Sequence, residues 1–287
     1  MKRIILASCL SLLVPSVTHA APQDKTSIQT LVDAEQRYEQ CLSFAGKAPD
    51  RGIGMALEWQ SDGGGVPARH CEAVGLFTLG EYREAAARFD RIASDARMGR
   101  GMPERGGKRL NPASTLISGL YGQAANAWLL AGYYSEAAES IEKAVALAEK
   151  GSDQYLEHLI DRARISAADD DYALALEDLQ LVLVSMPGRP DVLVMAATAA
   201  RAGGDVIMAS NYLEQALEFQ KDYAEALIER GHLHRQIGAP GLARTDWLKV
   251  IGLYPDTDAG ERARTALEAL EVAALKDTDP ATADKAN

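Results

Sequence analysis

The chain has 287 residues, of which 47% are hydrophobic and 25% are charged, a composition that allows a packed core and argues against a disordered chain. Alanine, leucine and glutamate are abundant and aromatic residues make up only 6%, which favours helices over a β-rich fold. The formal net charge of −11 disfavours nonspecific binding to nucleic acid, because phosphates repel an acidic surface.

The first twenty residues have the organisation of a secretory signal. Lys2 and Arg3 precede a largely apolar run from Ile4 to Val17, and small residues in Thr18-His19-Ala20 occupy the positions that a signal peptidase reads. This run is too short for a membrane span, and no other segment approaches the necessary length. We therefore expect export to the periplasm with removal of residues 1–20 after Ala20. Loss of two positive charges would change the net charge from −11 to −13.

Residues Leu6-Ala7-Ser8-Cys9 resemble a lipobox, the motif at which bacterial lipoproteins are cut and acylated. Only Ile4 and Ile5 separate this motif from Arg3, so no adequate apolar stretch precedes the cysteine. We therefore do not expect lipidation at Cys9, and we predict an exported protein rather than a lipoprotein.

Residues 25–66 are interpreted as a degenerate helix pair. The first helix is expected over residues 26–46, where apolar residues recur at helical spacing and share one face. The second is expected over residues 49–60 and carries Met55, Ala56 and Trp59. A glycine run at residues 63–65 then interrupts the helical pattern.

A pattern of two helices and a turn recurs five times over residues 67–257. Each copy has a turn, then an aromatic or other apolar residue, an alanine three positions later, and a large apolar residue four positions after that. The signature alanines, spaced 52, 38, 34 and 34 residues apart, are Ala85, Ala137, Ala175, Ala209 and Ala243. Twelve positions before each of them stands a small residue, at Ala73, Ala125, Ala163, Ala197 and Gly231. An ordinary helical bundle needs no such spacing, so the pattern predicts stacked repeats.

These features resemble the tetratricopeptide-repeat proteins, whose repeat is 34 residues long. Pro187 and Pro255 stand where the closing proline of that repeat is expected. The resemblance implies an all-α fold, a right-handed α-solenoid of antiparallel helix pairs, in which small residues let the helices approach and a tyrosine fills the wedge beneath the turn. The stretch from Cys41 to Cys71 is also similar to exported tetratricopeptide proteins of alphaproteobacteria, a group that implies no specific activity.

The predicted mature chain contains two cysteines, Cys41 and Cys71. An even number in an oxidising compartment suggests a disulfide, and in a solenoid a separation of 30 residues would join equivalent helices of neighbouring units. Such a bond could stabilise the fold by roughly 3 kcal/mol; the alternative is a pair of buried free thiols. His70 and two cysteines are too few for a structural zinc site, so we predict neither a metal nor a cofactor.

The gap of 52 residues contains an insertion at residues 97–112, with five basic residues and one acid. Gly106-Gly107-Lys108 fails as a phosphate-binding loop, because Met102 replaces the first glycine and Arg109 replaces the required serine or threonine. Two interpretations remain open: a mobile solvated loop, and a loop that binds an anionic partner.

Residues 258–275 are expected to form a helix that caps the array, with Ala263, Ala266, Leu267 and Leu270 on its apolar face. Residues 276–287 are rich in small, polar and charged residues and are expected to be disordered.

The resemblance implies a concave groove lined by the first helix of each repeat, where a partner peptide or protein segment lies. Arg164, Arg201 and Arg235 are predicted to form a basic strip in this groove beside His232, and guanidinium groups bind carboxylates well. Asn126 stands where some family members hold a terminal carboxylate, although the lysines of that clamp are absent here. The alternative is that these arginines pair with neighbouring acids on a solvated face.

No Ser-His-Asp set, metal-binding helix motif or nucleotide-binding glycine pattern occurs in a suitable context. We therefore predict a non-catalytic scaffold or adaptor of the periplasm that binds a protein or peptide partner and binds no nucleic acid. The arginines favour an acidic partner. A self-assembling structural module and an accessory subunit of a cell-envelope enzyme are the alternatives. The sequence determines neither the partner nor the oligomeric state.

Overall fold

The computed structural model describes residues 25–102, 104–105 and 108–277, so the predicted signal peptide, Cys9 and most of the predicted tail lie outside the described residues. Within the described part the chain forms thirteen helices and one short hairpin, and none of these helices has the length and apolarity needed to cross a membrane. The helices are α1 Lys25–Lys47, α2 Pro49–Ser61, α3 Gly65–Thr78, α4 Tyr82–Arg97, α5 Ser114–Leu130, α6 Tyr134–Leu147, α7 Asp153–Ala168, α8 Tyr172–Ser185, α9 Pro190–Ala202, α10 Val206–Phe219, α11 Ala224–Gln236, α12 Pro240–Leu253 and α13 Asp258–Asp277, and the strands are β1 Glu104–Arg105 and β2 Lys108–Arg109.

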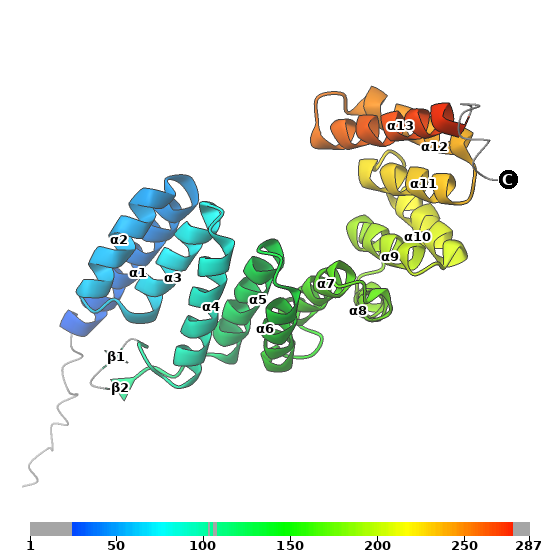
Figure 1. The fold of residues 1–287 in the computed structure, drawn as a ribbon. Coiled ribbons are helices and arrows are strands. Elements are labelled where there is room, and N and C mark those ends of the chain that lie inside the picture. The colour runs from blue at the N-terminus through cyan, green and yellow to red at the C-terminus, as the bar shows by residue number, and fades with distance from the viewer. Residues whose placement is uncertain (1–24, 103, 106–107, 278–287) are drawn as a thin grey trace, which may run out of the picture.

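The helices stack in chain order as antiparallel pairs, and together they form a curved rod from α1 to α13 (Figure 1). Most helices pack mainly on their neighbours in sequence, and α1 with α3, α5 with α7, α9 with α11 and α11 with α13 are also in contact. The predicted all-α solenoid of helix pairs is therefore confirmed. Only the small antiparallel hairpin in the insertion, with Glu104 opposite Arg109, was not expected.

A left-handed residue five positions before each signature alanine makes the turn between the two helices of a repeat. Glycine supplies this conformation in four repeats, for example Gly80 with φ 84° and Gly204 with φ 90°, because it lacks the Cβ that would clash. In the third repeat Asp170 takes the same conformation with φ 62°. The next residue, Asp171, then caps α8 by accepting a hydrogen bond from the backbone N–H of Leu174.

The small residues of the repeat lie where the two helices touch, and all five signature alanines are completely buried. The large residue four positions later is buried as well, and in the fifth repeat it is Trp247, which is 0% exposed. A Cβ added at Gly231 on the facing helix would lie 2.3 Å from Nε1 of Trp247. The glycine at this position therefore makes room for the tryptophan.

A buried carboxylate bridges the two helices of the first, third and fifth repeats, which the sequence analysis did not foresee. Each acid pairs with an arginine 16 positions away, and the charge order is reversed in the first repeat. The pairs are Glu72–Arg88 at 3.0 Å, Arg162–Asp178 at 2.6 Å and Arg230–Asp246 at 2.6 Å. Removing one partner of such a pair leaves a buried charge without compensation, which is strongly destabilising.

The tyrosines that follow the turns are only partly buried beneath them. Tyr82 packs its ring edge-on against Phe77, with ring centroids 5.3 Å apart. Tyr133 and Tyr134 are 36% and 38% exposed, and the hydroxyl of Tyr172 donates a hydrogen bond to Asp170 at the turn. These aromatic side chains therefore cover the turns more than they fill a cavity beneath them.

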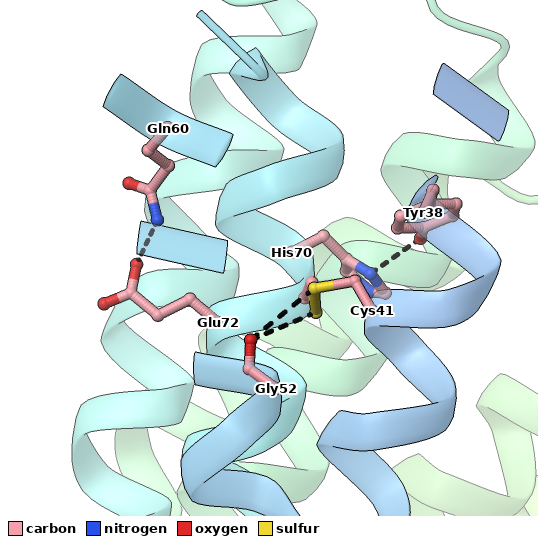
Figure 2. Close-up of a disulfide and its surroundings, with 7 residues drawn as sticks. Tyr38, Cys41, Gly52, Gln60, His70 and Glu72 are labelled. Atoms are coloured by element: carbon pink, nitrogen blue, oxygen red, sulfur yellow. Dashed lines mark hydrogen bonds between the residues drawn. A yellow bond between two sulfur atoms is a disulfide. The ribbon is translucent and has the colours of Figure 1, made fainter. Parts of the chain in front are cut away.

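The predicted disulfide between Cys41 and Cys71 is present and joins α1 to α3 (Figure 2). Both cysteines are completely buried, and their sulfur atoms lie 3.6 and 3.8 Å from the carbonyl oxygen of Gly52 on α2. A Cβ at Gly52 would lie 2.4 Å from the backbone nitrogen of Ala45. The first three helices are thus drawn tightly together around the bond, and the alternative of two free thiols does not apply.

The insertion has an ordered base. The backbone N–H of Val66 at the start of α3 donates to the carbonyl of Gly101 at 2.8 Å. Asp95 of α4 accepts hydrogen bonds from Arg69 at 2.6 Å and from Arg100 at 2.9 Å, and these bonds to cations hold the pKa of Asp95 below its usual value. The interpretation as a mobile loop therefore does not describe the base of the insertion.

At the other end of the rod, α13 packs against α11 and α12. Ala263 and Ala266 enter the apolar cluster that surrounds Trp247, and the helix continues to Asp277, two residues beyond its predicted end.

Candidate functional site

The first helices of the repeats carry two apolar hollows that lie next to each other. The first hollow, of about 420 Å³, lies among α3, α4, α5 and α7. Its apolar wall consists of Val74, Phe77, Phe89, Leu129 and Leu130, and its polar rim of Gln123, Asn126 and Arg164. Leu130 is 54% exposed although it is large and apolar, so this surface is available to a partner side chain.

The second hollow, of about 460 Å³, lies among α7, α8 and α9. Small and apolar residues of α7 and α9 form its floor, including Ala163, Ala167, Val194 and Met195, and two arginines stand at its rim, Arg164 and Arg201. Arg164 borders both hollows, so they are consecutive along the same face of the rod. We use the name inner groove for the two hollows together with Arg164, Arg201 and Arg235.

A hydrogen-bonded triad separates the two hollows. The side-chain amide of Asn126 donates to Asp161 at 2.8 Å and its oxygen accepts from Arg164 at 3.2 Å, while Arg164 forms an ion pair with Asp161. Asn126 therefore uses both ends of its amide within the protein. Arg164 is still half exposed, so its remaining N–H groups can reach a ligand in either hollow.

Arg201 is likewise held by an acid. Its Nε donates to Glu229 at 2.5 Å and its Nη1 donates to Gln236 at 3.3 Å, so the guanidinium spans α9 and α11. Burial raises the pKa of Glu229, although the arginine partly opposes this effect. Arg164 and Arg201 therefore both pair with neighbouring acids, which was the alternative to a free basic strip.

His232 and Arg235 differ from these two arginines. The ring of His232 packs edge-on against Trp247, with centroids 5.4 Å apart, and burial together with the charges of Arg201, Arg235 and Arg262 lowers the pKa of His232 to about 4. His232 is therefore neutral near pH 7. Arg235 is exposed and forms no ion pair with any acid in the described part of the chain. The predicted strip thus contains one unpaired cation, at its C-terminal end.

A chain of hydrogen bonds connects the N-terminal helix pair to the inner groove. The hydroxyl of Tyr38 lies 2.8 Å from Nδ1 of His70 (Figure 2). Nε2 of His70 lies 2.7 Å from Oε1 of Gln123, which is at the rim of the first hollow. With Tyr38 donating, His70 is neutral and donates in turn to Gln123. Burial lowers the pKa of His70, which agrees with this arrangement.

The sequence analysis named the charged residues of the groove but not its apolar walls. The repeat pattern explains buried positions, and it gives no reason for Phe77, Leu130 or Met195 on the first helices. Large apolar residues just before the turn, such as Leu129-Leu130, are the signal that could have indicated the first hollow. In the described residues no group of three or more histidine, cysteine, aspartate or glutamate side chains is placed to hold a metal ion.

Comparison with known proteins shows similarity at the level of the fold. No protein-family model matches the chain, and no curated protein matches it. PilW, a widely conserved type IV pilus biogenesis factor, is similar with a TM-score of 0.61 and 16% identity, over 82% of this chain and 98% of PilW. PilF of Pseudomonas aeruginosa gives 0.57 and 13%, over 84% and 99%. A chain of the APC/C hetero-tetramer Cut9–Hcn1 gives 0.54 and 16%, over 83% and 45%.

Proposed function

Because this chain has the fold of the tetratricopeptide-repeat proteins, we propose that it is a non-catalytic scaffold of the periplasm that binds an extended segment of a partner protein in its inner groove. The observation that carries this proposal is the pair of consecutive apolar hollows on the first helices, with Arg164 between them. Exposed apolar hollows with a few placed polar groups are typical of binding sites.

The chemistry of the groove suggests how the segment binds. Apolar side chains of the partner enter the two hollows and bury the exposed surface of Leu130 and its neighbours, which supplies most of the free energy of binding. Arg164, half exposed and positioned by Asp161 and Asn126, donates hydrogen bonds to a carbonyl of the segment between these side chains. The fixed arginine thereby sets the register of the partner.

The arginines at the C-terminal end of the groove favour an acidic group on the partner. Arg201 already shares its charge with Glu229, so Arg235 is the cation available for a carboxylate. His232 is neutral and adds no charge at pH 7. A segment with apolar residues followed by an acid or a C-terminal carboxylate therefore suits this groove, which lies in a chain of net charge −11.

The proposed location rests on two observations. Residues 1–20 are organised as a secretory signal, and the buried bond between Cys41 and Cys71 belongs to the kind that persists in oxidising compartments. Fusion of residues 1–20 to a reporter enzyme that is active only after export tests this location. A reporter that stays inactive would contradict it.

Selection from a phage-displayed random peptide library tests the groove directly. The enriched peptides would be synthesised and their affinity measured by fluorescence anisotropy for the wild-type protein and two variants. Leu130→Lys places a charge in the first hollow. Leu57→Lys is the matched control, because Leu57 on α2 is 51% exposed, close to the 54% of Leu130, and borders neither hollow.

We expect apolar residues to be enriched in the selected peptides, Leu130→Lys to weaken binding at least tenfold, and Leu57→Lys to leave it unchanged. Peptides that bind Leu130→Lys and the wild type equally well would place the binding surface elsewhere and contradict the proposal. Hydrogen exchange of the two variants without peptide would show that each retains its helices.

Self-assembly is a second candidate, favoured by one observation on the second helices. Leu181 and Val184 of α8 are 48% and 83% exposed, and Ile207 and Phe219 of α10 are 77% and 58% exposed. Exposed apolar residues on adjacent elements can mark a protein–protein interface. Light scattering after size-exclusion chromatography would detect an oligomer, and Val184→Glu should dissociate it. A wild-type protein that is monomeric at all concentrations would eliminate this candidate.

A further inference from the structure

The insertion between α4 and α5 differs sharply in charge from the rest of the chain. Residues 97–112 contain five basic residues and one acid, a net charge of +4, so the remaining residues carry −11 minus +4, which is −15. The hairpin of β1 and β2 lies within this insertion and projects beyond the ends of α3 and α4 (Figure 1). The molecule therefore has one strongly basic projection on an acidic body.

Several cations of this projection are open to solvent. The side chains of Arg97 and Lys108 are exposed. The side chain of Arg109 is 53% exposed, and its ion pair with Glu104 is long, at 3.8 Å. Exposed apolar side chains lie beside them, with Met98 at 54% and Leu110 at 39%. We call these five residues, Arg97, Met98, Lys108, Arg109 and Leu110, the basic face.

The base of the hairpin positions the basic face firmly on the rod. A Cβ at Gly65 would lie 2.3 Å from the carbonyl oxygen of Gly101, and a Cβ at Gly101 would lie 2.6 Å from Nη2 of Arg69. Both glycines have positive φ, 57° and 70°. This close contact, with the ion pairs of Asp95 to Arg69 and Arg100, fixes the insertion against the start of α3.

We propose that the basic face binds the anionic headgroups of a phospholipid membrane, independently of the inner groove. Cations attract such a surface, each contributing about 1 kcal/mol close to it, and adjacent apolar side chains such as Met98 and Leu110 insert at the boundary between headgroups and acyl chains. Nucleic acid would use the cations but has no acyl region for the two exposed apolar residues, and an acidic protein is the alternative that the experiment below distinguishes.

The acidic body determines the orientation in which the protein would attach. A surface of negative charge repels the remaining −15 of the chain and attracts only the projection, so the protein would attach by one edge of the rod. The hollows of the inner groove lie among α3, α4, α5 and α7 and among α7, α8 and α9, and none of the five residues of the basic face lines either hollow. Membrane attachment and partner binding can therefore occur together.

Co-sedimentation with vesicles tests the proposal, using phosphatidylcholine alone and phosphatidylcholine mixed with phosphatidylglycerol. The chain from Ala21 onward is the protein to use, because it contains every described residue and lacks the apolar run from Ile4 to Val17, which would bind bilayers by itself. The test variant is Lys108→Glu with Arg109→Glu. The control is Lys150→Glu with Lys221→Glu, which changes the net charge equally at two exposed lysines away from the hairpin.

We expect binding to the anionic vesicles and not to the neutral ones, a loss of at least about tenfold in the hairpin variant, and little change in the control. Binding should weaken strongly at high salt. Absence of binding to anionic vesicles at low salt, or an equal loss in both variants, would overturn the proposal. Binding to poly-glutamate or single-stranded DNA that exceeds vesicle binding would overturn the assignment to lipid. Circular dichroism of both variants controls for folding.

Discussion

Between α1 and α4 the helices are joined by a disulfide, by the polar chain from Tyr38 through His70 to Gln123, and by the base of the insertion. Between α9 and α13 the helices are joined by close packing around Gly231 and Trp247 and by ion pairs such as Arg230–Asp246. The second region has the regular spacing of 34 residues and the first does not. The covalent link of the described residues thus lies where the repeat pattern is weakest.

This difference has a physical reason. In a solenoid, stability is approximately the sum of each repeat and its contacts with its neighbours. A regular repeat presents complementary faces to the next one, and packing suffices. The N-terminal pair departs from the pattern, and there a cross-link that reduces the entropy of the unfolded chain adds to the packing.

The largest effect is expected in the C-terminal region, from Trp247→Ala. This change removes a completely buried side chain and leaves a cavity against Gly231, at a cost of about 3–5 kcal/mol. Hydrogen exchange should show lost protection in α11 to α13 and little change in α1 to α3. Uniform loss along the rod would show that the two regions are not independent.

The converse experiment removes the disulfide with Cys41→Ala and Cys71→Ala. Loss of a bond that closes a loop of this size should destabilise the N-terminal region by roughly 3 kcal/mol, with exchange increased in α1 to α3. Protection in α9 to α13 should stay as in the wild type. If urea denaturation of the variant and the wild type coincide, packing alone holds α1.

The ion pairs between helices provide a graded comparison. Arg162→Met leaves Asp178, which is 0% exposed, without its partner and should cost about 3 kcal/mol. Arg88→Met should cost less, about 1 kcal/mol, because Arg88 is 42% exposed and its contribution is screened by water. The order of the two urea midpoints checks this, and equal midpoints would refute the role of burial.

Each of the two regions contains a histidine that should make it sensitive to acid. The pKa of His232 is lowered to about 4 from 6.5, so between these values the unfolded chain binds more protons than the folded one. The contribution of His232 to the free energy of unfolding is therefore complete above pH 6.5 and is lost as the pH falls towards 4. For a ring that is partly exposed, we expect this loss to be about 1–2 kcal/mol.

His232→Gln should remove this part of the pH dependence in urea titrations at pH 7 and pH 4.5. A slope in the variant that matches the wild type would mean that other groups cause the acid sensitivity. The pKa of His70 is also lowered by burial, so His70→Gln gives the corresponding measurement for the N-terminal region.

The smallest effect on stability is expected at Arg235, which is exposed and has no acidic partner among the described residues. Arg235→Ala should change the free energy of unfolding by less than about 0.5 kcal/mol. It should nevertheless weaken the binding of selected peptides that carry an acid, and not of those without one, as measured by fluorescence anisotropy. Equal loss for both kinds of peptide would contradict its proposed role.

The sequence pattern could not show which arginines of the groove are paired with acids, for a specific reason. Arg201 and Arg235 each stand eight positions before their signature alanine and Arg164 stands eleven positions before its own, yet the pattern predicts the same groove for all three. Their partners come from different places: Asp161 lies on the same helix as Arg164, whereas Glu229 lies one repeat after Arg201. Only Arg235 is left without an acid in the described part of the chain. Which arginine is available to a ligand therefore depends on contacts between repeats.

By itself the sequence determined the helix pairs, their order and their turns, and it indicated a bond between Cys41 and Cys71 without excluding two free thiols. These features depend on neighbours along the chain or one repeat away, and a recurring pattern of small, large and turn-forming residues encodes them directly. A residue that tolerates the left-handed conformation, glycine in four repeats and aspartate in the third, stands five positions before the signature alanine and marks each reversal.

Only the tertiary structure decided how the surfaces of successive repeats combine. The first hollow brings Phe77, Leu130 and Arg164 together from three different helices, and the basic projection depends on Gly65 meeting Gly101 across an insertion. Such contacts arise from the distance and rotation between helices, which many small packing choices set jointly. No single position in the sequence records them, and for that reason they become visible only in three dimensions.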